Sequence, residues 1–206
     1  MFRYVIRRLL LALPTLFVIS LVTFAMSRYT GSGLESENYL EKPAAYLDKA
    51  KKLGLDQPIF YFNLTSAAFP DTLHRVLPLE VREHLEQLTR QTGNWVATGR
   101  FWRAVTTDLD PDLYAATGPA LITFKSLRQI QDLEKISAAL KKLRIQVDTL
   151  QNEALRATLK SRASTINTRF DELRQQSQIW KLYVPALHWH GTQNQYHRWA
   201  AGFFSG

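Results

Sequence analysis

The chain has 206 residues, of which 46% are hydrophobic and 21% are charged. Lys and Arg total 26 against 18 Asp and Glu, which leaves a formal net charge of +8. Cysteine is absent, which excludes disulfides, thiolate catalysis and cysteine-ligated metal sites. Basic and acidic residues are interspersed, as in LEKISAALKKLR, and this pattern indicates solvated helix faces and no nucleic-acid partner.

The first predicted element is a transmembrane helix at the N-terminus. Residues Leu9–Met26 carry no charge. A helix over them spans about 27 Å, close to the thickness of a bilayer's hydrocarbon core. Arg3, Arg7 and Arg8 precede the apolar run and Arg28 follows it. The positive-inside rule then predicts a cytoplasmic N-terminus and an extracytoplasmic location for residues after about 29.

A cleaved signal peptide is the alternative interpretation of this segment. It also begins with a basic region and continues with an apolar one, and Ala25 to Ser27 resembles a cleavage site. The apolar run is longer than the usual signal-peptide core of about 7–15 residues, which favours a retained span. Hydropathy alone leaves both interpretations open.

Helical sequence dominates the rest of the chain. One amphipathic helix has Val81, Leu85 and Leu88 on one stripe and Gly93 as its stop. Asn94 is a suitable N-cap for the next helix.

From Lys125 to Lys181 the chain contains neither Gly nor Pro. Apolar residues step by four and three along two series, which are Ile136, Leu140, Leu143, Val147 and Leu150, and then Leu159, Ala163, Ile166, Phe170 and Leu173. Two arrangements fit: one long interrupted helix, or an antiparallel hairpin that turns near Asn152. The hairpin is favoured because an exposed helix of that length is unusual in a globular domain. In either case the stripes predict packing between helices.

Residues with metal-binding or catalytic chemistry are sparse. His188, His190 and His197 are candidate zinc ligands, but no HExxH motif is present and no carboxylate is close in sequence to support them. Aromatic and hydrogen-bonding roles near a membrane surface are favoured, so no metal site is predicted. The chain also lacks a P-loop and a GxSxG motif, and we predict that it is not an enzyme.

Three stretches, in order, are FRYVIRRLLLALPTLFVISLVTFAM, KKLGLDQPIFYFNL and NQYHRWAAGFFSG. Together they resemble the membrane permease subunit of binding-protein-dependent ABC importers of the dipeptide/oligopeptide type. The residues that carry the resemblance are Arg7, Arg8, Pro14, Gly54, Leu55, Asp56, Gln57, Pro58, Gln195, Tyr196 and Trp199.

The resemblance covers about 1–64 and 186–206, and the chain departs from the family in two respects. An "iPGDP"-like turn usually follows the first span, whereas this chain has TGSGLESENYL. The further spans and the cytoplasmic coupling loop of the family are not in this sequence. The chain therefore resembles the front end of a permease.

The resemblance implies part of an importer for peptides or related solutes in the bacterial inner membrane. It implies a second permease subunit, cytoplasmic ATPase subunits, an extracytoplasmic solute-binding protein and membrane lipid as partners. The chain itself would hold no cofactor, since partner subunits use the ATP. The alternative is a single-pass anchored, or secreted, helical interaction domain.

The predicted fold is all-α, with one transmembrane helix followed by an extracytoplasmic hairpin or bundle-like domain. The predicted segments are the cytoplasmic tip and span (1–29), a family segment with GLDQP (30–64), an inserted helical domain (65–185), and a membrane-proximal aromatic segment leading to a missing second span (186–206).

Two aromatic stretches flank the inserted domain, and two roles are open for them. Trp and Tyr favour the water–lipid boundary, so both stretches could lie along the outer leaflet. Core packing in an extracytoplasmic domain is the alternative. The residues are Ile59, Phe60, Tyr61, Phe62, Trp189, Tyr196, Trp199, Phe203 and Phe204.

Overall fold

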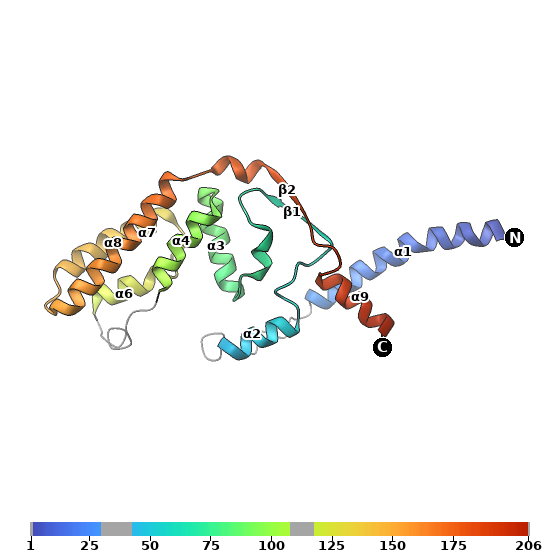
Figure 1. Cartoon of the computed structure of the whole chain (residues 1–206), viewed down its shortest axis with the longest axis horizontal. Helices are drawn as coiled ribbons and strands as arrows, with labels where there is room; N and C mark the ends of the chain where they lie inside the picture. The colour runs from blue at the N-terminus through green and yellow to red at the C-terminus, as the bar shows by residue number, and fades with distance from the viewer. Residues whose placement is uncertain (1, 30–42, 108–117, 206) are drawn as a thin grey trace. The chain divides into compact units, whose positions relative to one another are not determined.

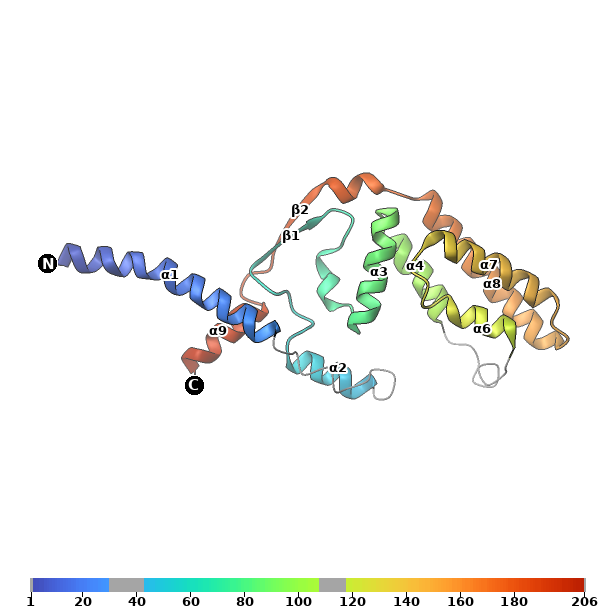
Figure 2. The same ribbon diagram turned by 180° about the vertical axis from the view of Figure 1, so that it is seen from behind.

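The computed structural model describes residues 2–29, 43–107 and 118–205, and these are mostly helical (Figures 1 and 2). The elements are α1 (Phe2–Tyr29), α2 (Pro43–Lys52), β1 (Phe62–Ser66), a 3-10 turn (Asp71–Arg75), α3 (Leu79–Thr92), α4 (Trp95–Thr106), α6 (Pro119–Ser126), α7 (Leu133–Asp148), α8 (Glu153–Gln175), a second 3-10 turn (Ile179–Tyr183), β2 (Pro185–Trp189) and α9 (Gln195–Ser205).

The chain divides into two compact units. Unit 1 comprises Met1–Asn63, His74–Pro78 and Leu187–Gly206, and unit 2 comprises Leu64–Leu73 and Leu79–Ala186. The inserted domain was predicted at 65–185, and residues 30–42 of the predicted family segment lie outside the described residues.

Unit 2 is a layered helical domain. Its helices pack in the order α3, α4, α8, α7 and α6, because α8 contacts both α4 and α7. The predicted apolar stripes on α7 and α8 form much of its core, together with residues of α3, α4 and α6. The core members of α7 and α8 are Ile136, Leu140, Leu143, Val147, Leu155, Leu159, Ala163, Ile166, Phe170 and Leu173.

Helices α7 and α8 form the predicted antiparallel hairpin. Helix α7 ends at Asp148, α8 begins at Glu153, and the two pack side by side (Figure 1). Asn152 caps α8, since its side-chain oxygen accepts the Leu155 N–H at 3.0 Å. The turn near Asn152 is confirmed, and one long helix is excluded.

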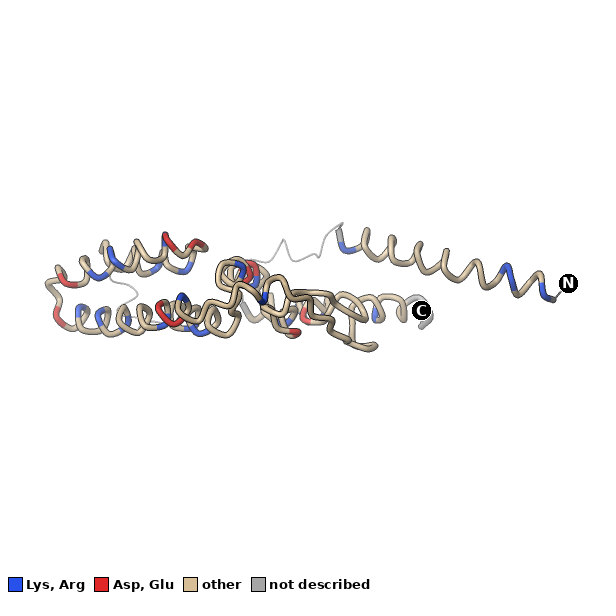
Figure 3. The backbone as a smooth tube through the Cα atoms, turned by 90° about the horizontal axis from the view of Figure 1, so that it is seen from above, with Lys and Arg blue, Asp and Glu red and all other residues tan. Residues whose placement is uncertain are grey.

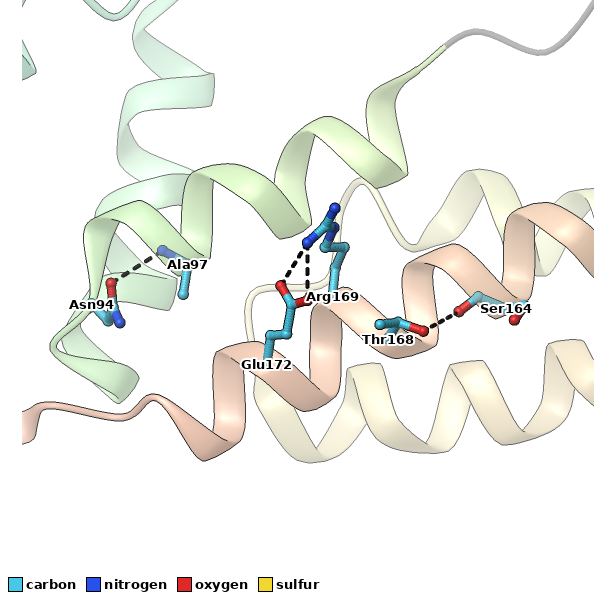
Figure 4. Close-up of polar contacts among 6 residues, drawn as sticks. All are labelled: Asn94, Ala97, Ser164, Thr168, Arg169 and Glu172. Carbon is cyan, nitrogen blue, oxygen red and sulfur yellow. Dashed lines mark hydrogen bonds and ion pairs between the residues drawn. The ribbon is translucent and has the colours of Figure 1, made fainter.

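Asn94 caps α4 as predicted (Figure 4), and its side chain also bonds to the residue that follows α8. Its Oδ1 accepts the Ala97 N–H at 3.1 Å, and its Nδ2 donates to the Gln176 carbonyl at 2.9 Å. On α8 itself, Arg169 donates to both carboxylate oxygens of Glu172, at 2.9 and 2.8 Å.

The prediction of an all-α fold is wrong in one respect, because β1 and β2 form a two-stranded sheet. The His190 N–H donates to the Tyr61 carbonyl at 2.7 Å, and the Ala67 N–H donates to the Val184 carbonyl at 2.8 Å. These two bonds define an antiparallel ribbon, and the boundary between the units falls within both strands. Each strand has five residues, and β1 (FNLTS) alternates apolar and polar residues only briefly, so the sequence analysis did not identify either strand.

In unit 1, α1 is a continuous helix that runs through Pro14. Its segment Arg3–Arg28 is long and apolar enough to cross a membrane, and it is the one such helix among the described residues. Figure 3 shows Lys and Arg at its two ends and none between them. The Thr15 and Thr23 hydroxyls donate to carbonyls one turn earlier, at 3.3 and 2.9 Å, which satisfies them inside an apolar segment.

Candidate functional site

The beginning of α9 lies against the GLDQP segment, although the two are far apart in sequence. The Gln195 N–H donates to the Pro58 carbonyl at 2.9 Å, and the Tyr196 N–H donates to the Ile59 carbonyl at 3.1 Å. The Gln195 side chain adds a bond from Nε2 to the Gln57 carbonyl at 2.6 Å. Amides in the first turn of a helix have no partner within it, so these bonds satisfy α9 and fix the segment on it.

Asn194 completes the start of α9. Its Oδ1 accepts the His197 N–H at 2.7 Å, and its Nδ2 donates to the Gly191 carbonyl at 2.7 Å. The side chain is buried, so both polar ends of the amide are satisfied inside the protein. Asn194 is therefore the N-cap of α9.

Gly54 of GLDQP ends helix α2 in a Schellman motif. The Leu55 N–H donates to the Ala50 carbonyl and the Gly54 N–H to the Lys51 carbonyl, each at 2.9 Å. Gly54 has a φ of 72°, a left-handed conformation that only glycine adopts without strain. Leu55 is buried with Tyr46 and Ala50 in the small core of unit 1. The left-handed conformation therefore explains Gly54 of the motif, and burial in the core explains Leu55.

Arg198 connects α9 to the end of α2. Its Nη2 donates to the Lys52 carbonyl at 2.9 Å, and this carbonyl belongs to the last turn of α2. A cation is favourable there because helix carbonyls concentrate negative potential at the C-terminus. The Lys52 side chain bonds in turn to the Asp48 carboxylate at 2.8 Å, which raises the pKa of Lys52 above its ordinary value.

Tyr196 joins α9 to α1. Its hydroxyl lies 2.6 Å from Ser20 Oγ, and the Tyr196 side chain is buried. The Tyr196 ring also makes edge-on and tilted contacts with neighbouring aromatic rings, and such contacts add stability beyond the area that they bury. Five rings lie with centroids between 5.2 and 6.3 Å from that of Tyr196: Phe17, Phe24, Phe60, Tyr61 and Trp199.

We call this region, formed by residues 54–61, residues 194–199, Ser20 and Phe24, the α9 junction. Figures 1 and 2 show α9 crossing the C-terminal half of α1, where Trp199 lies against Phe24 at 5.6 Å. Asp56 is the one carboxylate in these residues. Backbone bonds, aromatic contacts and one hydroxyl pair hold the segments, so the arrangement acts as a structural joint.

The histidines are distributed over separate contacts. His197 Nδ1 lies 3.1 Å from the Tyr61 hydroxyl, whereas His190 stacks edge-on against His74 at 5.7 Å. His188 lies on β2. Within residues 2–29, 43–107 and 118–205, no group of three or more His, Cys, Asp or Glu is arranged to hold a metal ion.

The remaining motif residues lie outside the junction or at its edge. Arg7, Arg8 and Pro14 are exposed on the N-terminal half of α1, where the Arg8 guanidinium lies 5.1 Å from the Tyr4 ring centre. Asp56 is half-buried beside the Gly54 turn. The structure thus brings together the GLDQP and NQYHRW residues and leaves the three from the first motif apart.

Three contributors to the junction escaped the sequence analysis: Ser20, Asn194 and Arg198. Asn194 carries a usable signal, since Asn directly before a helical segment is a typical N-cap. Nothing local to Ser20 indicates its partner, which lies 176 residues away in the chain. The bond from Arg198 to a carbonyl of α2 depends entirely on the tertiary fold.

Unit 2 has a shallow polar groove of about 670 Å³ between α7 and α8. Hydroxyl and amide groups lie along it, and Lys160 pairs with Asp148 across the hairpin at 3.7 Å. Its charged residues are Lys141, Arg144, Asp148, Lys160, Asp171 and Arg174. The groove thus carries four basic and two acidic residues.

Comparisons of the chain with known protein families, with curated proteins and with solved structures found no match.

Proposed function

We propose that the chain is the N-terminal part of a permease subunit of a binding-protein-dependent ABC importer for peptides or related solutes. One observation carries the proposal: the GLDQP segment, the NQYHRW segment and the apolar helix meet in the α9 junction. The long intervening sequence folds largely as unit 2. The contact between the matched segments supports the proposal.

In the proposed orientation, α1 crosses the bacterial inner membrane with its N-terminus in the cytoplasm. The excess of Arg before the apolar run supports this orientation. A permease of this type alternates between inward-open and outward-open states, and cytoplasmic ATPase subunits drive the change. The α9 junction would hold the first span against the extracytoplasmic segment during that cycle.

We assign to unit 2 a docking role outside the membrane. It is helical, well packed and presents the charged groove between α7 and α8. The solute-binding protein or the second permease subunit would be the partner on this surface.

Orientation is tested first, and the absence of cysteine makes this direct. Single variants Tyr4→Cys and Ser164→Cys are treated with a membrane-impermeant maleimide in spheroplasts. Ser164→Cys should react in intact spheroplasts, and Tyr4→Cys only after lysis. Reaction of Tyr4→Cys in intact spheroplasts would contradict the orientation, and loss of α1 from the mature protein would favour a secreted domain.

Transport is tested with the product of the complete gene, tagged and purified in mild detergent. Copurification of ATPase subunits and a second permease is expected, together with peptide uptake that depends on the gene. Deletion of residues 70–180 should weaken association with the solute-binding protein. Correct orientation without ATPase subunits would favour the alternative, a single-pass anchored interaction domain.

A further inference from the structure

Four large apolar side chains of unit 1 are exposed beside the ribbon. Their exposed fractions are 62% for Ile59, 50% for Phe62, 70% for Leu187 and 73% for Trp189. The register of the ribbon places Phe62 opposite Trp189, and in a strand Leu187 shares the face of Trp189. We call these four residues the apolar ribbon face. Ile59 precedes β1 in the chain and is also exposed. Exposed apolar residues gathered in this way mark a candidate membrane or protein contact.

The apolar ribbon face is connected to α1 by short, direct contacts within unit 1. Tyr61, next to Phe62, bonds to His190, next to Trp189. The Tyr61 ring also contacts Tyr196 at 5.8 Å, and the Tyr196 hydroxyl pairs with Ser20 on α1. The depth of α1 in a bilayer therefore determines the depth of the apolar ribbon face.

The arginines at the two ends of the apolar run of α1 define that depth. Arg8 and Arg28 are about 30 Å apart along the helix, which equals the thickness of a hydrocarbon core. Ser20 lies about 12 Å from Arg28 by the same rise per residue, within one leaflet. Tyr196 is therefore anchored about 12 Å below the Arg28 end of that leaflet. The face attached to it through Tyr61 and His190 lies near enough to reach the boundary, where Trp and other aromatic residues are favoured.

The charge of the surrounding surface suits anionic lipid. No acidic residue occurs in 57–63 or 187–199. After α1, the described part of unit 1 has two acidic residues, Asp48 and Asp56, against five basic ones: Lys49, Lys51, Lys52, Arg75 and Arg198. Basic groups beside an apolar face add electrostatic attraction to anionic headgroups.

We propose that the apolar ribbon face (Ile59, Phe62, Leu187 and Trp189) inserts into the headgroup–acyl boundary of the bilayer that α1 spans, on the side of Arg28. This inference rests on the membrane-spanning part of the proposed function. Unit 1 would then contact the membrane twice, through the span and through the apolar ribbon face at the boundary, in addition to its proposed transport role.

The test uses the full chain in vesicles of phosphatidylcholine and phosphatidylglycerol. Spin labels are attached to the single variants Phe62→Cys and Leu187→Cys, with Ile59→Cys as a further position. Val18→Cys on α1 reports the span itself. Ile145→Cys on α7 of unit 2 is the control, because Ile145 is about as exposed (67%) as Leu187 (70%) and no lipid contact is proposed for it. Accessibility to oxygen, which concentrates in lipid, is compared with accessibility to a water-soluble nickel chelate.

Labels at 62 and 187 should be several-fold more accessible to oxygen than to nickel, as at 18, whereas the label at 145 should show the reverse. Lipid exposure at 18 with water exposure at 59, 62 and 187 would overturn the proposal and leave the span intact. Water exposure at 18 as well would overturn both. Exclusion of both reagents at 62 and 187 would indicate a protein contact in place of lipid, and would also overturn the proposal.

Discussion

Gly93 directly follows α3, and the chain that follows α8 packs against it at Gln178. It has a φ of 68°, and a Cβ built on it would lie 2.2 Å from the Gln178 carbonyl oxygen. The backbone at Gln178 is held there by its N–H, which donates to the Thr92 carbonyl at 2.6 Å. Backbone cannot move aside as a flexible side chain does, so only glycine fits.

Gly93→Ala should therefore lower the free energy of unfolding of unit 2 by more than about 2 kcal/mol, from strain and collision together. The measurement is urea denaturation of the full chain in detergent, followed by circular dichroism. Gly99→Ala is the matched control, because a Cβ there meets nothing within 4 Å. It lies inside α4 and should gain about 0.5–1 kcal/mol. Equal effects of the two variants would contradict the argument.

His84 is buried on α3 against the Trp102 ring, with 4.4 Å between ring centres. Desolvation lowers the pKa of His84 below its ordinary value. The unfolded state then binds a proton that the folded state does not, as pH falls below about 6.5. The stability of unit 2 should decrease through that range and level off below the folded pKa.

The measurement is the urea midpoint at several pH values, followed by tryptophan fluorescence. His84→Leu should remove this contribution and flatten the profile between about pH 7 and 5. An unchanged pH profile in the variant would assign the effect to other groups.

At the scale of elements, Asn94 caps α4 and bonds to the chain after α8 with the same side chain. Asn94→Ala removes both bonds and should destabilise unit 2 by about 1–2 kcal/mol. Asn152→Ala removes the cap of α8 alone and should have the smaller effect. Thermal unfolding of both variants decides the comparison, and an equal loss would mean that the bond to Gln176 contributes nothing.

The contact between α1 and α9 depends on the pair Ser20 and Tyr196. A double-mutant cycle with Ser20→Ala and Tyr196→Phe should give a coupling of about 0.5–1.5 kcal/mol, as for other hydrogen bonds in apolar surroundings. Unfolding in detergent micelles measures it. Additive effects of the two substitutions would show that the hydroxyls do not act as a pair.

At the scale of the whole molecule, unit 1 is compact by itself, because its residues mostly contact other residues of unit 1. Asn63 and His188 are opposite each other in the ribbon as a hydrogen-bonded pair, and a two-residue type I′ turn closes such a pair. Replacement of residues 64–187 by Asn-Gly should leave a folded, membrane-inserted protein. The loss of Leu77 from the small core should lower its stability by about 1–2 kcal/mol.

The shortened protein is compared with the full chain by helix content and by the Ser20–Tyr196 coupling. Preservation of that coupling is expected, because both residues belong to unit 1. A non-cooperative melt would show that unit 1 requires the intervening sequence.

Local patterns in the sequence determined the long apolar helix, the apolar stripes of α7 and α8, the cap at Asn94 and the stop at Gly93, and they favoured the hairpin over one long helix. Each depends on hydrogen bonds and side-chain faces within a few turns of helix, and these repeat with a period that the sequence displays. The predicted stripes contain all the buried apolar residues of α7 and α8 except Leu155, while the predicted Leu150 lies after α7 and is only partly buried.

The tertiary structure alone decided the β1–β2 ribbon, the pairing of Ser20 with Tyr196 and the bonds from α9 to residues 57–59. These contacts join segments that lie more than a hundred residues apart, and neither partner carries a pattern that names the other. GLDQP and NQYHRW could be singled out as motifs, but not as one site. Their meeting depends on packing within unit 1, because a non-local contact is selected by the whole packing and not by its own sequence.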